Sequence, residues 1–227
     1  MNKILARVPS SARASLAAVG LSVALALSGA AAHAAQVASL NVNLLQNGGA
    51  EKGAASSNGS TLVPIPKWGS GGAAVVVSYS LGGGFPGVDS PGSANRGLQF
   101  FAGGQNNEQS AITQRVDLSP LLMDIDGGSL TFVLQAWLGG FSSQQDNASL
   151  KVEFFDAAGV RLSSGVLPAV TAEERGNVTG MLLRKITGAV PIGTRSAKAT
   201  LVMRRLAGSY NDGYADGLSL VLKLAQP

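Results

Sequence analysis

The sequence has no cysteine and a single histidine, His33, close to the N-terminus. Without cysteine there is no disulfide bond, so stability comes from the hydrophobic core or from a hard cation held by oxygen atoms. The chain after His33 has no histidine general base, no Ser-His-Asp or Cys-His arrangement and no His/Cys zinc site. The chemistry that remains uses carboxylates, tyrosine, lysine and arginine.

Acidic residues are absent before Glu51, and this N-terminal part has the features of a secretory signal peptide. Three basic residues precede an apolar stretch over residues 16–27, and a small-x-small motif follows at residues 32–34. The apolar stretch is shorter than the ~20 residues that usually span a membrane. We therefore predict that residues 1–34 are a cleaved signal peptide. Residues 35–227 then form one exported domain, secreted or periplasmic, with attachment to the cell surface left open.

The predicted mature chain has little net charge, because its 14 Lys and Arg residues face 13 Asp and Glu residues. It contains no run of basic residues and no alternation of basic with aromatic residues, which argues against nucleic acid as a partner. It also contains no second long apolar stretch. We therefore expect no membrane span in the mature chain.

Short alternations of apolar and polar residues, separated by glycine- and serine-rich turns, fill the mature chain. This pattern is typical of antiparallel strands, and no stretch shows a capped helical period. The predicted strands cover residues 39–45, 74–80, 98–102, 112–118, 129–138, 149–155, 160–164, 181–186, 197–205 and 218–224. About ten short strands in one domain predict an all-β fold, a two-sheet antiparallel β-sandwich or jelly roll.

Two segments at opposite ends of the mature chain are more specific than its composition. Residues 43–51 read Asn-Leu-Leu-Gln-Asn-Gly-Gly-Ala-Glu, and residues 209–220 read Ser-Tyr-Asn-Asp-Gly-Tyr-Ala-Asp-Gly-Leu-Ser-Leu. They resemble the opening and the last strand of galactose-binding-like jelly rolls, which include many carbohydrate-binding modules. The chain looks most similar to the F-box-associated-like variants of secreted bacterial proteins. Three shorter motifs between them, at residues 66–68, 97–101 and 114–119, follow in the expected order.

This resemblance implies a structural Ca²⁺ ion between the first and last strands. Glu51 and Asp216 match the carboxylate ligands of that family, and Gly53 would offer its carbonyl oxygen. A hard cation takes six to eight oxygens, which carboxylates and carbonyls can supply. Two positions depart from the family pattern: Ala50 replaces the usual Phe, and Gly217 replaces a second Asp or Asn. The alternative is that both segments are turns with no ion.

Strand alternation suggests a ligand-binding surface. In residues 130–138 the even positions are all apolar and the odd positions are mixed. Sugar recognition needs an aromatic plane and a few polar groups for the hydroxyls. The mixed positions predict that Trp137, Gln135, Glu153 and Arg204 share one sheet face, where they could meet this need. We predict that these four residues bind the ligand, which is a glycan or a cell-surface component.

Three further aromatic residues lie in or next to loops: Trp68, Tyr210 and Tyr214. Galactose-binding-like folds use such loops as an edge site. Trp68 is expected to be structural, because large aromatic side chains are usually well buried. For Trp137 a structural and a binding role remain equally open. Aromatic residues make up only 5% of the chain, which argues against a strong cellulose-type binder.

Catalysis is left with carboxylate pairs, such as Asp124 with Asp126 and Glu173 with Glu174. A glycosidase needs two carboxylates held across a cleft, whereas neighbouring carboxylates in turns are normally solvated. We therefore predict an exported, non-catalytic, carbohydrate-binding-like protein with a structural calcium site. A surface or extracellular-matrix protein with a structural or adhesive role, contacting other proteins, is the alternative. A carboxylate-based hydrolase is a more remote one.

Overall fold

The computed structural model describes Met1 and residues 37–225. The predicted signal peptide, residues 1–34, lies outside the described residues apart from Met1. The fold is contained in one compact unit, Gln36–Pro227. In the described part, no helix is both long and apolar enough to cross a membrane.

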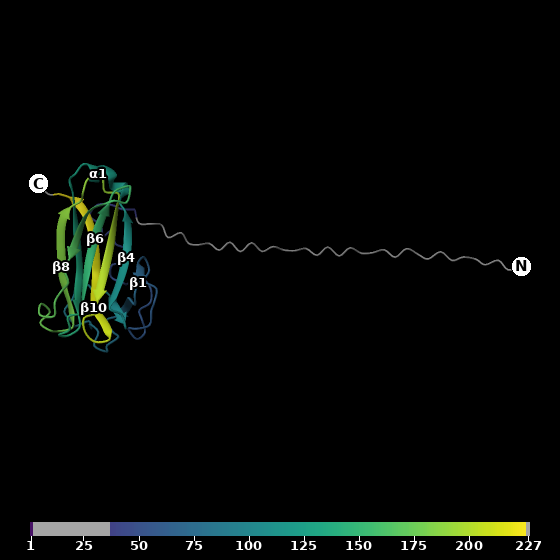
Figure 1. Cartoon of the computed structure of the whole chain (residues 1–227), viewed down its shortest axis with the longest axis vertical. Helices are drawn as coiled ribbons and strands as arrows, with labels where there is room; N and C mark the ends of the chain where they lie inside the picture. Colours follow the sequence, from purple (N-terminus) through teal and green to yellow (C-terminus); the bar gives the residue numbers. More distant parts are fainter. Residues whose placement is uncertain (2–36, 226–227) are drawn as a thin grey trace. The chain divides into compact units, whose positions relative to one another are not determined.

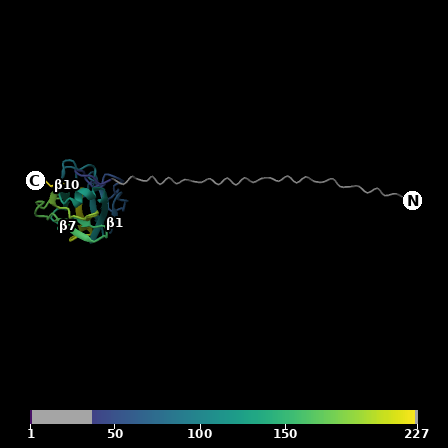
Figure 2. The same cartoon turned by 90° about the horizontal axis from the view of Figure 1, so that it is seen from above.

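Two five-stranded antiparallel sheets form a β-sandwich (Figure 1). Sheet A has the strand order β1-β4-β9-β6-β7, and sheet B has the order β2-β3-β10-β5-β8. Figure 2 views the sandwich from above, with β1 and β7 labelled at the two edges of sheet A. The elements are β1 (Gly69–Gly71), β2 (Val75–Ser78), β3 (Gln99–Gln105), β4 (Gln109–Asp117), η1 (Ser119–Leu121), α1 (Leu122–Asp126), β5 (Leu130–Gly140), β6 (Asn147–Phe155), β7 (Arg161–Leu167), β8 (Gly180–Ala189), β9 (Ser196–Arg204) and β10 (Tyr210–Leu224). The predicted all-β sandwich is confirmed.

The main core lies between the two sheets, and strand alternation builds it. The even residues of β5 from Leu130 to Leu138 are at most 5% exposed, as the sequence predicts. Leu150, Val152 and Phe154 of β6 face them from sheet A. Because these side chains point inward from both sheets, the odd residues of β5 and β6 point to the two outer faces.

Strand β10 changes its alternation at Gly217, which has a φ of +59°. The pairing of β10 with β5 shifts register between Asp216 and Ser219, which marks a β-bulge. Before the bulge the even residue Tyr214 packs on the outer face of sheet B. After it, the even residues Leu218, Leu220 and Leu222 lie in the main core. Glycine suits this position because a side chain is disfavoured at positive φ.

The first predicted strand, residues 39–45, is not a strand. Asn41 has a φ of +63°, which interrupts an extended backbone. The segment nevertheless runs beside β10: Asn41 N donates to Leu222 O and Leu44 N to Leu220 O, each at 2.8 Å. The opening and closing segments therefore lie side by side, as the resemblance implies. The short strand β1 and the helix α1 are absent from the sequence-based prediction.

Candidate functional site

A long loop, residues 79–98, covers part of the outer face of sheet B. Beneath it lies a second hydrophobic cluster, separate from the main core. The alternation of β2 and β3 explains this, because Val76 and Phe101 face the main core whereas their neighbours face outward. The buried residues of the second cluster are Val75, Val77, Tyr79, Phe100, Ala102, Met181 and Tyr214.

Arg96 fixes the covering loop. Its guanidinium donates to the carbonyl oxygens of Ser93, Gly87 and Ser90 at 2.8–2.9 Å. The same group lies 5.2 Å from the centre of the Tyr79 ring, a cation–π contact. The loop also reaches the edge strand β8, where Met181 N donates to the Pro91 carbonyl oxygen at 2.9 Å. These contacts hold the loop against the sheet.

Phe85 extends from this loop and packs edge-on against Tyr210, with ring centroids 5.3 Å apart. Phe100 and Tyr214 lie 6.4 and 6.1 Å from the same ring. The run Gly82-Gly83-Gly84 allows the loop to turn here, since all three residues have positive φ. The loop thus brings an aromatic side chain over the beginning of β10.

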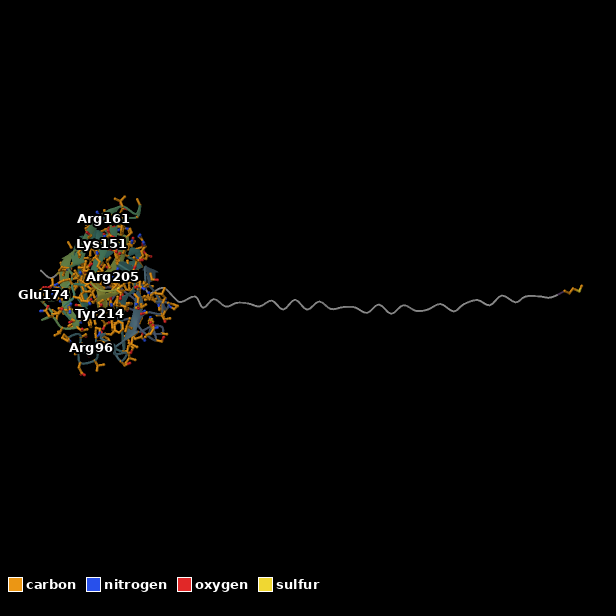
Figure 3. All side chains as sticks on the ribbon, turned by 60° about the horizontal axis from the view of Figure 1, so that its bottom comes forward. Arg96, Lys151, Arg161, Glu174, Arg205 and Tyr214 are labelled. Atoms are coloured by element: carbon orange, nitrogen blue, oxygen red, sulfur yellow. The ribbon has the colours of Figure 1, made fainter. Side chains whose placement is uncertain are left out.

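A cavity of about 270 Å³ opens beside Phe85. We call it the aromatic cavity; its lining residues are Asn58, Ser60, Gly83, Gly84, Phe85, Phe141, Tyr210, Asp212 and Tyr214. Four of these carry aromatic rings, and one carries a carboxylate. Figure 3 brings forward the end of the sandwich opposite α1 and shows Tyr214 there. The alternation of β10 places Tyr210, Asp212 and Tyr214 on this side of sheet B.

The carboxylate of Asp212 is the titratable acid of the aromatic cavity. It accepts a hydrogen bond from the Tyr214 hydroxyl. Burial is the largest cause that raises the pKa of Asp212; the Tyr214 hydrogen bond lowers it and the nearby Asp146 carboxylate raises it, which together give a pKa of about 6. Burial also raises the pKa of both cavity tyrosines, so their hydroxyls stay protonated at neutral pH.

Buried groups behind the cavity hold Asp212 in place. Asp146 is fully buried and accepts three backbone N–H groups, from Leu206 at 2.6 Å, Ala207 at 2.8 Å and Asp212 at 2.9 Å. The Arg175 guanidinium, 4% exposed, donates to the carbonyl oxygens at positions 142, 144 and 178. These bonds fix the connection that follows β5, on which Phe141 lies.

The predicted four-residue surface is wrong. Gln135 and Trp137 lie on β5 of sheet B, whereas Glu153 lies on β6 and Arg204 on β9 of sheet A. Their side chains therefore point to opposite outer faces of the sandwich. The reason is that β5 and β6, although consecutive in the sequence, belong to different sheets, so equal alternation does not mean a shared face.

Each of these side chains has its own surroundings. Trp137 is half-buried against the second cluster. Glu153 is paired with Lys151 at 2.9 Å and with Arg161 at 3.1 Å. None of the four predicted residues lines the aromatic cavity. Whether any of them binds a ligand stays a prediction.

The predicted calcium ligands meet at the place that the resemblance implies. A Cβ atom on Gly49 would lie 3.6 Å from Asp216 Oδ1 and 3.7 Å from Glu51 Cγ. However, Asp216 Oδ1 accepts from Gly217 N at 2.6 Å, and Oδ2 accepts from the Tyr79 hydroxyl at 2.8 Å. Burial is the largest cause that raises the pKa of Asp216, to about 7.

The remaining predicted ligands are also hydrogen-bonded. Glu51 Oε1 accepts from the backbone N–H groups of Leu98 and Gln99, each at 3.0 Å, and the Gly53 carbonyl accepts from the Gln99 side chain at 3.4 Å. In residues 37–225 no group of three His, Cys, Asp or Glu side chains could hold a metal. Two carboxylates and one carbonyl supply fewer than the six to eight oxygens that a Ca²⁺ ion takes, so the calcium site stays a prediction. Hydrogen bonds join the segments here.

The three aromatic residues predicted in or next to loops have different surroundings. Trp68 is 7% exposed, packs edge-on against Phe101 at 6.1 Å and donates to the Asn47 carbonyl at 3.2 Å, so its expected structural role is confirmed. Tyr210 and Tyr214 line the aromatic cavity. Sequence reasoning missed Phe85 and Asp212. The glycine run before Phe85, and the position of Asp212 two residues from each tyrosine, were the available signals.

The carboxylate pairs considered for catalysis lie outside the aromatic cavity. Asp126 is paired with Arg195 at 2.7 Å, and Glu174 is paired with Arg184 at 2.6 Å. Both acids are well exposed. The hydrogen bond from Arg195 lowers the pKa of Asp126, and hydrogen bonds from the Thr171 backbone and from Arg184 lower the pKa of Glu174. A carboxylate with a lowered pKa is a poor general acid at neutral pH.

Comparison with solved structures finds similar folds at low sequence identity. A family 16 carbohydrate-binding module is 20% identical, with 79% of this chain and 99% of that chain covered and a TM-score of 0.49. The apo form of a cyclase from Fischerella sp. is 11% identical, with 82% and 97% covered and a TM-score of 0.50. A family 61 carbohydrate-binding module in complex with β-1,4-galactotriose is 15% identical, with 81% and 99% covered and a TM-score of 0.40. No known protein family and no curated protein matches the sequence.

At these identities the likenesses concern the fold alone. The likeness to the cyclase agrees with the two antiparallel sheets, so the predicted two-sheet antiparallel β-sandwich is confirmed as a fold. Binding modules and a cyclase occur side by side among them. Since one fold can host many functions, the function has to be argued from the aromatic cavity.

Proposed function

We propose that this protein is an exported, non-catalytic glycan-binding domain and that the aromatic cavity is its binding site. The observation that carries the proposal is the grouping of four aromatic rings with one buried carboxylate around a cavity of about 270 Å³. Aromatic faces pack against the apolar face of a sugar ring, and a carboxylate accepts hydrogen bonds from hydroxyl groups.

The size of the cavity supports recognition of a single sugar residue. Its volume lies just below the ~300–1,000 Å³ typical of drug-sized ligand sites. The covering loop closes one side through Phe85, and the Tyr210 hydroxyl, bonded to Gly59 O at 2.6 Å, closes another. A terminal or branching sugar fits such a site better than an extended stretch of polysaccharide.

The arrangement of acids supports binding without catalysis. A glycosidase uses two carboxylates on either side of the scissile bond. Among residues 37–225, the lining of the aromatic cavity contains one, Asp212. The neighbouring Asp146 is fully buried, and both of its oxygens accept backbone hydrogen bonds. Export is supported by the signal-like pattern of residues 1–34, and N-terminal sequencing of the released protein would test it.

A glycan array followed by titration calorimetry tests the proposal. Tyr210→Ala and Phe141→Ala should each weaken the binding of the best oligosaccharide by about tenfold, because each removes an aromatic contact. Arg204→Ala and Glu153→Gln, on the far side of the sandwich, should leave it unchanged. Loss of binding in these two controls would move the site to sheet A. A folded protein that binds no glycan would favour the protein-contact alternative.

A further inference from the structure

The charge at the aromatic cavity is negative. Asp212 is 9% exposed and lines the cavity, and the fully buried Asp146 lies behind it. No lysine or arginine is among the lining residues in the described part of the chain. The ion pairs formed by residues 37–225 do not include either acid. The cavity therefore presents a carboxylate without a counter-ion.

The arginine side chains near the cavity donate hydrogen bonds to backbone carbonyl oxygens. Arg175 directs its bonded nitrogens at three carbonyl oxygens, at positions 142, 144 and 178. Arg96 bonds three carbonyls of the covering loop, and Arg205 bonds the Gly208 carbonyl at 3.0 Å. The charged group that shifts the pKa of Asp212 is another acid, Asp146. None of these cations neutralises Asp212 by direct contact.

The aromatic walls of the cavity also favour a cationic ligand. An aromatic face is the negative side of the ring's quadrupole and attracts cations, most strongly where water is excluded. Phe85, Phe141, Tyr210 and Tyr214 supply four rings around the one carboxylate. A ligand with an ammonium group would serve as the missing counter-ion and lie against the rings. An acidic sugar would meet only repulsion at Asp212.

We propose that the aromatic cavity selects a protonated amino sugar, a hexosamine residue with a free ammonium group, at the end or branch of a glycan. This inference rests on the proposed glycan-binding function and names the sugar class within it. The ammonium group pairs with the Asp212 carboxylate, while the ring lies against the cavity aromatics. Neutral sugars bind more weakly, because their hydroxyls offer uncharged hydrogen bonds to the same oxygen atoms.

Titration calorimetry at pH 6.5 with four matched trisaccharides tests the inference: glucosamine, N-acetylglucosamine, glucose and glucuronic acid oligomers. We expect the glucosamine trimer to bind at least tenfold more tightly than the neutral trimers, and the acidic trimer to bind least. Asp212→Asn should abolish the preference of the site for the glucosamine trimer over the neutral trimers. Asp124→Asn removes an exposed carboxylate from α1 and should leave the preference unchanged.

The outcomes separate the two proposals. If amino and neutral trimers bind equally and Tyr210→Ala weakens both, the glycan site stands and the charge preference is wrong. A preference that survives Asp212→Asn would also overturn the inference, because the attraction would come from elsewhere on the surface. Free choline binding more tightly than the glucosamine trimer would replace the amino sugar by a small ammonium ligand. If no trimer binds to a folded protein, the glycan-binding function itself fails.

Discussion

The two outer faces of the sandwich are built from similar strands, but they differ in polarity and in whether a loop covers them. On sheet A the outward residues of the central strands are mostly polar or charged and partly exposed, among them Thr113, Lys151, Lys198 and Thr200. On sheet B the outward residues at one end are aromatic and covered by loop 79–98. The covering loop, more than the sheet, therefore turns a face into a cavity.

Removing a ring from the covered face should have the largest effect. Phe100 is fully buried, with the rings of Tyr79, Phe85 and Tyr214 at 4.8, 6.4 and 5.5 Å. Phe100→Ala should lower the free energy of unfolding by about 3–5 kcal/mol in urea titrations. Thr200→Ala on the outer face of sheet A should change it by less than about 0.5 kcal/mol. Equal effects would show that the second cluster is not a core.

Ionisation of Asp212 in the aromatic cavity should make the free energy of unfolding lower above about pH 6 than at about pH 4. The pKa of Asp212 is about 6 in the fold against 3.8 as its ordinary value, so the folded protein holds the proton more tightly than the unfolded chain. The free energy of unfolding therefore falls as the pH rises from about 4 to about 6 and is level above. Asp212→Asn does not titrate and escapes this fall.

Relative to the unmodified protein, Asp212→Asn should gain about 2 kcal/mol at pH 7.5 and nothing at pH 4. Urea titrations of both proteins at these pH values measure the difference. Carboxyl groups that do not interact with Asp212 contribute equally to both proteins and cancel in the comparison. A variant that is less stable at pH 7.5 would show that Asp212 has a counter-ion.

Backbone strain at the loop tip should have a smaller effect. Gly83 has a φ of +66° and open space around its Cα, so Gly83→Ala tests conformation without a clash. It should lower the free energy of unfolding by about 1 kcal/mol. Gly87→Ala, with ordinary φ and its nearest contact at 3.9 Å, is the matched control and should change little. A neutral Gly83→Ala would mean that the loop tip is free to adopt another conformation.

Calcium should have the smallest effect. Because the Asp216 and Glu51 carboxylates accept hydrogen bonds from the protein, we expect the melting temperature with excess Ca²⁺ to stay within about 1 °C of that with a chelator. Differential scanning calorimetry measures it. A rise of several degrees in Ca²⁺ that Asp216→Asn abolishes would establish the ion that the family resemblance implies.

The fold could be predicted from the sequence more completely than the candidate site. Alternation gave the inward side chains of β5 and β6 correctly, since burial alone decides them. It could not assign the outward side chains to a common face, because Trp137 and Glu153 belong to different sheets. The position of Phe85 could not be predicted for another reason: its loop has no period, and its conformation depends on side-chain contacts such as those of Arg96 with the Gly87 and Ser90 carbonyls.

The bulge at Gly217 has a practical consequence for engineering. Residues 210–216 and residues 218–222 of one strand follow opposite alternations, so ligand specificity can be redesigned in the first part while the second is left untouched. A single-residue deletion at 217 would instead exchange the two alternations, sending either leucines toward the solvent or tyrosines toward the interior. Libraries that vary the binding end of β10 should therefore keep its length constant.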